Sequence, residues 1–207
     1  VQARRPGTLI VSSIYKCDKC TKWHAGNASG VALTRSGIFA TCYHAIAATN
    51  SHAFVVGTVD GRTAPVVEVL AADKKSDVAI CRAEGIRFDP TPLAAANPVE
   101  GSPVSVISHP KGRFYTLTTG QVSRYFFKPI SKSRSVPFMA ITAEFAKGSS
   151  GGPVLDANGN LVGLAASTYS IYYNVENGRQ ENMQMTLRHC VPVEAIHGLI
   201  RQGRKTD

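Results

Sequence analysis

The sequence predicts an all-β protein built from many short strands, and three observations indicate this. Short apolar segments rich in Val, Ile, Thr and Tyr recur along the chain, and these residue types favour strands. Gly, Pro, Asn or Asp bound each segment, as turn residues do. A long helical pattern is present only near the C-terminus. Short strands with regular turn signals are typical of a sandwich or a barrel.

The expected strands follow from these apolar segments in chain order. They lie at residues 9–14, 30–34, 38–41, 53–59, 64–70, 77–81, 103–108, 114–123, 137–142, 153–155 and 161–167. Asp60-Gly61 and the segment 156–160 each separate two such runs, which predicts two hairpins. The polar segment 169–181 is expected to form either a mobile loop or a long hairpin.

The C-terminal helix is expected at residues 193–202, directly after Pro192. Apolar positions recur there at helical spacing, so one face would dock on the sheets as a brace. Between the strands, residues 86–101 contain three prolines and suit an extended connection. The predicted organisation is therefore one domain over 1–207, with β halves at about 8–85 and 102–190.

Composition limits the classes of partner that the chain would bind. The 23 Lys and Arg exceed the 14 Asp and Glu, which gives a net charge of +9. The basic residues are scattered and no periodic basic helix joins them, so we expect a solvated basic surface and no nucleic-acid binding. No apolar run approaches the roughly 20 residues that cross a bilayer, so no membrane association is expected. The chain opens at Val1, and we expect that a leader has been removed and that the protein is exported.

Residues 147–153 carry the most informative motif, a serine pair between glycines. Glycines on both sides of Ser150 allow a tight turn with outward-facing N–H groups. A serine hydroxyl is a weak nucleophile until a neighbouring base accepts its proton. The motif therefore predicts a nucleophile if a histidine and a carboxylate lie close to it.

His44 and Asp77 are the expected partners of Ser150. His44 follows the strand at 38–41 and begins a short Ala-rich turn, and Asp77 stands at the entry to an apolar strand, where its carboxylate could hold the imidazole. Asp73 is the rival carboxylate, but its Asp-Lys-Lys setting indicates a solvated side chain. No catalytic role is assigned to the other histidines, which are His24, His52, His109, His189 and His197.

These motifs resemble those of trypsin-like serine proteases. Residues 148–153 resemble the nucleophile loop of that family, while residues 28–33, 41–46 and 76–80 resemble the N-terminal barrel of its bacterial HtrA (Deg) branch. The resemblance implies two perpendicular six-stranded antiparallel barrels and a C-terminal helix, with the active site in the cleft between the barrels. The PDZ modules typical of that branch have no counterpart in the 207 residues.

The resemblance also implies a function. Serine endopeptidases of this family cleave polypeptides through an acyl-enzyme without a metal or another cofactor. The N–H groups of Gly148 and Ser150, aided by that of Ser149, would stabilise the oxyanion. The oligomeric state is left open.

The resemblance places the specificity pocket as well. Glu144, six residues before the nucleophile, would form its floor, and Ala166, Ser167 and Thr168, with Ala165 before them, one wall. A buried Glu144 would select Lys or Arg as the residue before the cleaved bond (P1). HtrA-like relatives favour small aliphatic side chains, and in that alternative Glu144 points away into an ion pair.

Cys17 and Cys20 form a Cys-x-x-Cys pair with His24 close behind. Thiolate and imidazole ligands suit zinc, but a complete site would need a fourth ligand, for which Cys190 and His189 are candidates. A local disulfide and two reduced thiols are the other possibilities. Cys42 and Cys81 fall on predicted core strands and are expected to be small buried hydrophobic residues.

Two rival functions remain beside proteolysis. One is a protease fold that binds peptides without cleaving them, and the other is a basic interaction domain with bound zinc or nucleic acid. Substrate binding without turnover would favour the first. Stoichiometric zinc, or binding with a steep salt dependence, would favour the second.

Overall fold

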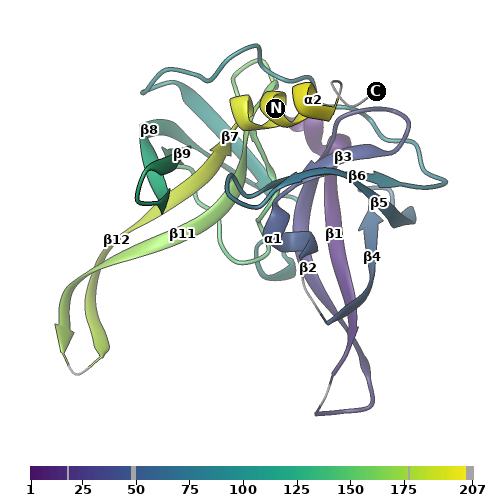
Figure 1. Cartoon of the computed structure of the whole chain (residues 1–207), viewed down its shortest axis with the longest axis horizontal. Coiled ribbons are helices and arrows are strands. Elements are labelled where there is room, and N and C mark those ends of the chain that lie inside the picture. The colour runs from purple at the N-terminus through teal and green to yellow at the C-terminus, as the bar shows by residue number, and fades with distance from the viewer. Residues whose placement is uncertain (18, 48–49, 177, 204–207) are drawn as a thin grey trace.

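The computed structural model describes residues 1–203 apart from 18, 48, 49 and 177. Its strands close into two antiparallel barrels of six strands each, which lie side by side (Figure 1). This confirms the predicted all-β class, the two barrels and the C-terminal helix.

The first barrel has the strand order β1-β2-β3-β6-β5-β4. A short 3₁₀ helix, η1 (Gln2–Gly7), precedes it, and the short helix α1 (Tyr43–Ile46) follows β3. Its strands are β1 (Thr8–Lys16), β2 (Trp23–Ala32), β3 (Ile38–Thr41), β4 (Ser51–Gly57), β5 (Thr63–Asp73) and β6 (Val78–Ala83).

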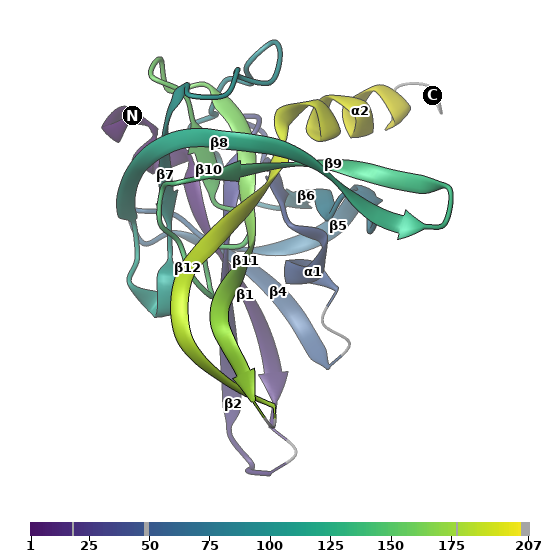
Figure 2. The same ribbon diagram turned by 90° about the vertical axis from the view of Figure 1, so that its left-hand side faces the viewer.

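The second barrel has the strand order β10-β11-β12-β9-β8-β7 (Figure 2). A single 3₁₀ turn, η2 (Pro110–Gly112), follows β7, and α2 (Val193–Gly203) follows the last strand. Its strands are β7 (Pro103–Ser108), β8 (Thr116–Ser131), β9 (Arg134–Ile141), β10 (Pro153–Leu155), β11 (Leu161–Glu176) and β12 (Arg179–Pro192).

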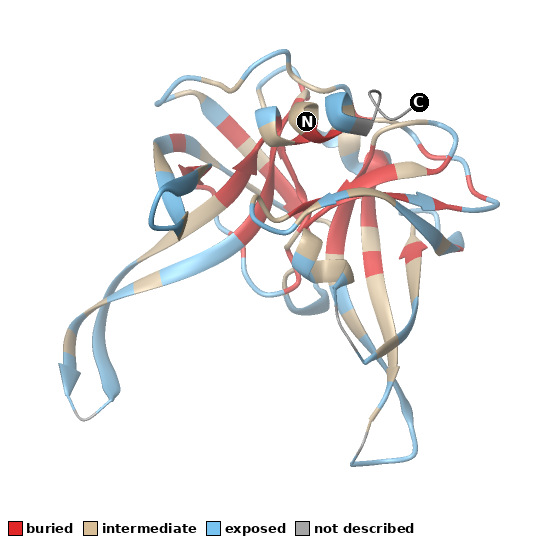
Figure 3. Cartoon of the chain, in the orientation of Figure 1, coloured by how far each residue is buried: buried red, intermediate tan, exposed pale blue. Residues whose placement is uncertain are grey.

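Each barrel has its own apolar interior, and a third cluster joins the two. Phe39 and Leu9 are fully buried in the first barrel, and Met139 is fully buried in the second. The joining cluster packs residues of the first barrel, such as Val31, against residues of the second, such as Leu164. Buried residues accordingly continue from one barrel into the other (Figure 3). Because burial of each such side chain contributes about 1.5–3 kcal/mol, the junction holds the barrels in a fixed relation.

Helix α2 packs across this junction, against β5 of the first barrel and β11 of the second (Figure 1). Val193, Ile196 and Leu199 form its buried face. The His197 ring lies 2.8 Å from the Ala94 carbonyl oxygen, in the connection between the barrels. No helix in the described residues combines the length and the apolar character that a membrane span requires.

The strand predictions miss one strand, and others differ at their ends: β2 begins at Trp23 instead of residue 30, and β8 ends at Ser131 instead of residue 123. They include no strand at β12, whereas β11 and β12 pair along most of their length as a long hairpin. The outer part of β12 is exposed, and Met183, Met185 and Leu187 alternate there with polar residues, a pattern of period two that the strand predictions did not use. Of the two expectations for residues 169–181, the long hairpin is the one that the structure shows. Its distal half projects from the barrel and is exposed (Figure 3).

Candidate active site

His44, Asp77 and Ser150 meet where the two barrels face each other. His44 lies on α1, on the side of the first barrel toward the second (Figure 1). Its Nε2 is 2.9 Å from Ser150 Oγ, and its Nδ1 is 2.8 Å from Asp77 Oδ2. The structure therefore brings together the three residues that the sequence singled out, from three separate segments of the chain.

Asp77 holds His44 at two points. Its carboxylate lies beside Nδ1, and its Oδ1 also accepts the backbone N–H of His44 at 3.0 Å. Asp77 has a left-handed backbone conformation, with φ of 55°, which a non-glycine residue seldom adopts. Backbone strain of this kind is often found at functional sites. A carboxylate accepts a hydrogen bond from Nδ1–H. Nε2 of a neutral imidazole is then a hydrogen-bond acceptor directed at Ser150.

The rival carboxylate, Asp73, is used elsewhere. Its Oδ1 accepts the Lys75 N–H at 2.9 Å, and its Oδ2 accepts the Ser76 hydroxyl at 2.7 Å. These bonds close the turn that leads to Asp77. Asp73 thus stabilises the turn, while Asp77 contacts the histidine.

The loop that carries Ser150 requires glycine at two positions. Gly148 and Gly151 have φ of 97° and 84°, in the region that favours glycine. A Cβ on Gly151 would lie 2.2 Å from the Ser29 carbonyl oxygen, and one on Gly148 would lie 2.6 Å from that of His109. The loop therefore packs against both barrels without room for side chains at these glycines.

Ser29, on β2 of the first barrel, holds this loop in place, and the sequence analysis assigned it no catalytic or binding role. Its hydroxyl donates to the Gly148 carbonyl oxygen at 2.9 Å and accepts the His109 N–H at 3.2 Å. Its backbone N–H donates to the Ser150 carbonyl oxygen at 2.8 Å. Ser29 is fully buried. A buried serine in a strand gives no sequence signal of such bonds, because its partners lie in the other barrel.

His109 lies behind the same loop and is fully buried. Its Nδ1 accepts the Tyr115 N–H at 3.0 Å. Burial lowers the pKa of its imidazole to about 4, and this outweighs an opposing effect of the Leu9 backbone. The ring is therefore neutral near pH 7 and serves as a hydrogen-bonded part of the loop's support.

The backbone donors of the loop differ in availability. Ser149 N–H already donates to the Ala146 carbonyl oxygen at 2.9 Å. This corrects the expectation that Ser149 aids as a third oxyanion donor. In the part of the chain that the structure describes, no hydrogen-bond acceptor is recorded for the N–H of Gly148 or of Ser150. Ser149 is buried, and its hydroxyl accepts that of Ser108 at 2.9 Å.

Glu144 does not form a buried acidic floor. Its side chain is 76% exposed, and its Oε1 lies 2.8 Å from a guanidinium nitrogen of Arg188, which is itself only 13% exposed. The expectation of a buried glutamate is therefore wrong, and the ion-pair alternative describes the structure. Arg188 on β12 lies opposite Thr168 on β11, so the pair sits beside the expected pocket wall.

The wall residues lie on β11 next to the nucleophile. Ser150 Oγ is 3.2 Å from the Ala166 carbonyl oxygen. Ala166 is buried, whereas Ser167 and Thr168 are exposed. The expected pocket wall therefore begins beside the serine hydroxyl at Ala166 and becomes exposed to solvent at Ser167 and Thr168.

Cys42, Cys81 and Cys190 are fully buried, as small hydrophobic residues are. Cys42 is buried beside the site, and its burial and the charge of Asp77 raise the pKa of its thiol, which stays protonated. Cys17, Cys20 and His24 lie together, with their ligand atoms within 4.8 Å of one another. The suggested fourth ligands are wrong, because Cys190 is buried in the core of the second barrel and the His189 ring packs against that of Phe126, with centroids 4.6 Å apart and planes tilted by 53°.

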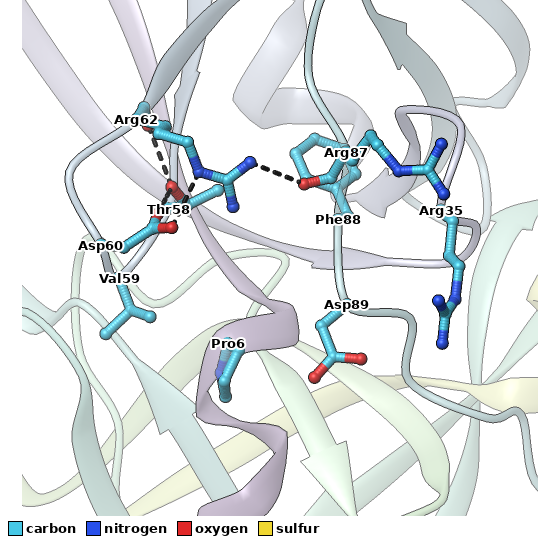
Figure 4. Close-up of a pocket in the computed structure, with 9 residues that line it drawn as sticks. All are labelled: Pro6, Arg35, Thr58, Val59, Asp60, Arg62, Arg87, Phe88 and Asp89. Atoms are coloured by element: carbon cyan, nitrogen blue, oxygen red, sulfur yellow. Dashed lines mark hydrogen bonds and ion pairs between the residues drawn. The ribbon is translucent and has the colours of Figure 1, made fainter.

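A pocket of about 290 Å³ lies apart from these residues (Figure 4). Residues of the first barrel and of the connection line it, with Arg35, Arg62 and Arg87 beside Asp60 and Asp89. Arg62 is bound internally, by Asp60 at 2.8 Å and by the Arg87 carbonyl oxygen at 3.1 Å. This mixed-charge pocket contains none of the residues that contact Ser150.

Comparisons with known proteins identify similar chains. A family model described as "Trypsin-like peptidase domain" matches residues 28–164. "Protease Do-like 1, chloroplastic" from Arabidopsis thaliana is 27% identical over 86% of this chain and 39% of its own length. "Serine protease PepD" from Mycobacterium tuberculosis is 31% identical over 65% of this chain and 30% of its own length. The chain thus spans less than half of these two relatives.

Two further likenesses bear on location and fold. A "Probable periplasmic serine endoprotease DegP-like" from Hahella chejuensis is 27% identical over 69% of this chain and 30% of its own length. The crystal structure of Rv3671c from M. tuberculosis, in an inactive form, superposes with a TM-score of 0.73 and 19% identity. The match covers 100% of this chain and 91% of that one. At this identity the structural likeness shows the fold alone.

Proposed function

Since this chain belongs to the trypsin-like peptidase domain family, we propose that it is a serine endopeptidase in which Ser150 is the nucleophile. In this proposal His44 is the general base and Asp77 orients it. The contact of His44 Nε2 with Ser150 Oγ, at 2.9 Å, carries the proposal. A base within hydrogen-bond reach of a hydroxyl, itself held by a carboxylate, is the arrangement that activates serine.

Acylation would begin when Ser150 Oγ attacks the carbonyl carbon of the substrate. His44 Nε2 accepts the hydroxyl proton as the new C–O bond forms, and the carbonyl π electrons move to the oxygen. Asp77 stabilises the resulting imidazolium without taking its proton. The imidazolium then protonates the amide nitrogen, the C–N bond breaks, and an ester on Ser150 remains.

The negative oxygen of the tetrahedral intermediate would be bound by the N–H groups of Gly148 and Ser150. Support comes from their having no recorded acceptor in the described residues, while that of Ser149 is engaged. Loss of one such donor raises the barrier by about 3 kcal/mol in other serine proteases. Water, deprotonated by His44, would then release the acid and regenerate the hydroxyl.

The substrate in this proposal is an extended polypeptide. A peptide strand could pair with the β11 backbone beyond Ala166, where Ser167 and Thr168 are exposed. The ion pair of Glu144 with Arg188 neutralises the acid that would attract a basic P1 residue. We therefore expect the cleavage site to follow neutral P1 side chains.

The two barrels and helix α2, as their brace, would act as one protease domain over 1–207. The apolar cluster that joins Val31 of the first barrel to Leu164 of the second supports this, because His44 and Ser150 come from different barrels. Export of the protein is proposed from the relatives named as periplasmic.

Cleavage of a peptide library by the wild type and by Ser150→Ala tests the proposal. We expect turnover by the wild type and its loss in the variant, with unchanged circular dichroism and peptide affinity. Equal turnover by both proteins would refute the role of Ser150. Binding without turnover by the wild type would instead favour the non-catalytic peptide-binding module.

A further inference from the structure

A cluster of two cysteines and one histidine at the tip of the β1–β2 hairpin has no part in the proposed proteolysis. One ligand atom each of Cys17, Cys20 and His24 lies within 4.8 Å of the other two. Cys20 Sγ is 3.0 Å from His24 Nε2. The hairpin tip points away from both barrel interiors (Figure 1).

The strand register places Cys17 and His24 on one face. Tyr15 pairs with His24 and Lys16 pairs with Trp23, so the ladder ends where Cys17 begins the turn. Side chains alternate along a strand, so Cys17 lies on the same face as Tyr15 and its cross-strand neighbour His24.

The remaining contacts orient these side chains. The Tyr15 ring stacks on the His24 ring, with centroids 5.7 Å apart and planes 22° from parallel. This stacking limits rotation of the imidazole. Cys20, which lies in the turn, places its Sγ 3.0 Å from Nε2 of His24. Strand pairing and ring stacking therefore hold the His24 ring close to the sulfur atoms of Cys17 and Cys20.

The distribution of cysteines points in the same direction. Cys42, Cys81 and Cys190 are fully buried and fill space in the cores as small apolar residues. Cys20 is exposed and Cys17 is half-buried, and both lie at the hairpin tip outside the buried cores.

We propose that Cys17, Cys20 and His24 bind one Zn²⁺ ion at the tip of this hairpin. Two thiolates and an imidazole are ligands that zinc prefers, with Zn–S of about 2.3 Å and Zn–N of about 2.0 Å. Binding releases the two thiol protons, and the two thiolate charges balance the ion. In the described part of the chain the cluster holds three protein ligands, so the fourth position takes water or an external ligand.

The ion has a structural consequence, because it cross-links the end of a two-stranded ribbon. The tip carries the exposed Trp23, whose ring meets that of His52 edge to face at 5.1 Å. A two-stranded hairpin is only marginally stable by itself in water. Zinc would close the turn and protect the amides between Tyr15 and His24 from exchange.

The test is zinc binding by the full chain, as Ser150→Ala to prevent self-cleavage, reduced with a phosphine and stripped of metal. Zn²⁺ is then added alone, and bound metal is measured by elemental analysis after gel filtration. We expect about one equivalent. Co²⁺ in its place should give the thiolate charge-transfer band and the visible bands of a tetrahedral site. In Cys20→Ser we expect neither the stoichiometric zinc nor the Co²⁺ bands. Its zinc affinity should fall by more than the roughly 10- to 100-fold that changes of residues around the ligands cost.

Two control variants and one exchange measurement make the result specific. His52→Ala removes a neighbouring histidine outside the cluster and should retain the ion. His44→Ala should also retain it, which excludes the second cluster of possible ligands, Cys42, His44 and Asp77. Hydrogen exchange at the hairpin should slow on Zn²⁺ addition in the parent but not in Cys20→Ser. No uptake by the reduced parent, or equal uptake by Cys20→Ser, would overturn the proposal.

Discussion

Acid should destabilise this protein through His109, whose neutral ring supports the loop of Ser150. The native pKa is about 4, against 6.5 for an unperturbed histidine. Between these pH values the unfolded chain binds a proton at His109 and the native protein does not. The free energy of unfolding therefore falls as pH decreases from 6.5 to 4, and this contribution levels off below 4.

The size of the effect follows from the difference between the two pKa values. One pKa unit corresponds to about 1.4 kcal/mol, so the loss at His109 amounts to about 3 kcal/mol. That is a sizeable part of the 5–15 kcal/mol that is roughly typical of native proteins. Because His109 is fully buried, solvent screening does not reduce this figure appreciably.

Urea denaturation from pH 8 to pH 4, in the Ser150→Ala background, measures the effect. His109→Gln keeps an acceptor for the Tyr115 N–H but cannot titrate. It should be less stable at pH 8 yet lose about 3 kcal/mol less than its parent on acidification. Burial also lowers the pKa of His189, but this contribution is present in both proteins and cancels. His52→Gln, at an exposed histidine, is the matched control. Equal acid losses in the parent and His109→Gln would refute the reasoning.

Three further substitutions test the loop and the pocket. Ser29→Ala leaves the buried Gly148 carbonyl and His109 N–H without their partner, so it should cost about 2 kcal/mol in unfolding free energy and lower kcat, with Ser36→Ala as a neutral control. Gly151→Ala forces the loop to move and should reduce kcat/KM by about 100-fold, whereas Gly61→Ala, also at positive φ but with open space around its Cβ, should not. Arg188→Ala releases Glu144, so cleavage profiling should show a gain for Lys and Arg at P1, and an unchanged profile would contradict the pocket assignment.

The fold and the meeting of His44, Asp77 and Ser150 could be predicted because each is marked by a local signal. Apolar segments between turn residues gave the strands, and the glycines around Ser150 marked the loop. The long β11–β12 hairpin was only one of two expectations, although apolar and polar residues alternate along both of its strands. The apolar side chains of its outer part are exposed, so burial in a core does not decide the pairing there.

The role of Ser29 could not be predicted, and that of Glu144 was left between two expectations, because both depend on contacts between distant segments. Ser29 meets Gly148 across 119 residues of chain, and Glu144 meets Arg188 across 44. The Cys17, Cys20 and His24 cluster was foreseeable as a pattern of ligands. Its expected fourth ligand was wrong because Cys190 belongs to the core of the other barrel.

The most direct test of the central claim is the site at which a fluorophosphonate probe attaches, determined by mass spectrometry of the digested protein. We predict one adduct, on Ser150, which is lost in Ser150→Ala and forms far more slowly in His44→Ala because the hydroxyl then lacks its base. Adduct formation on another residue, or undiminished labelling of His44→Ala, would contradict the account.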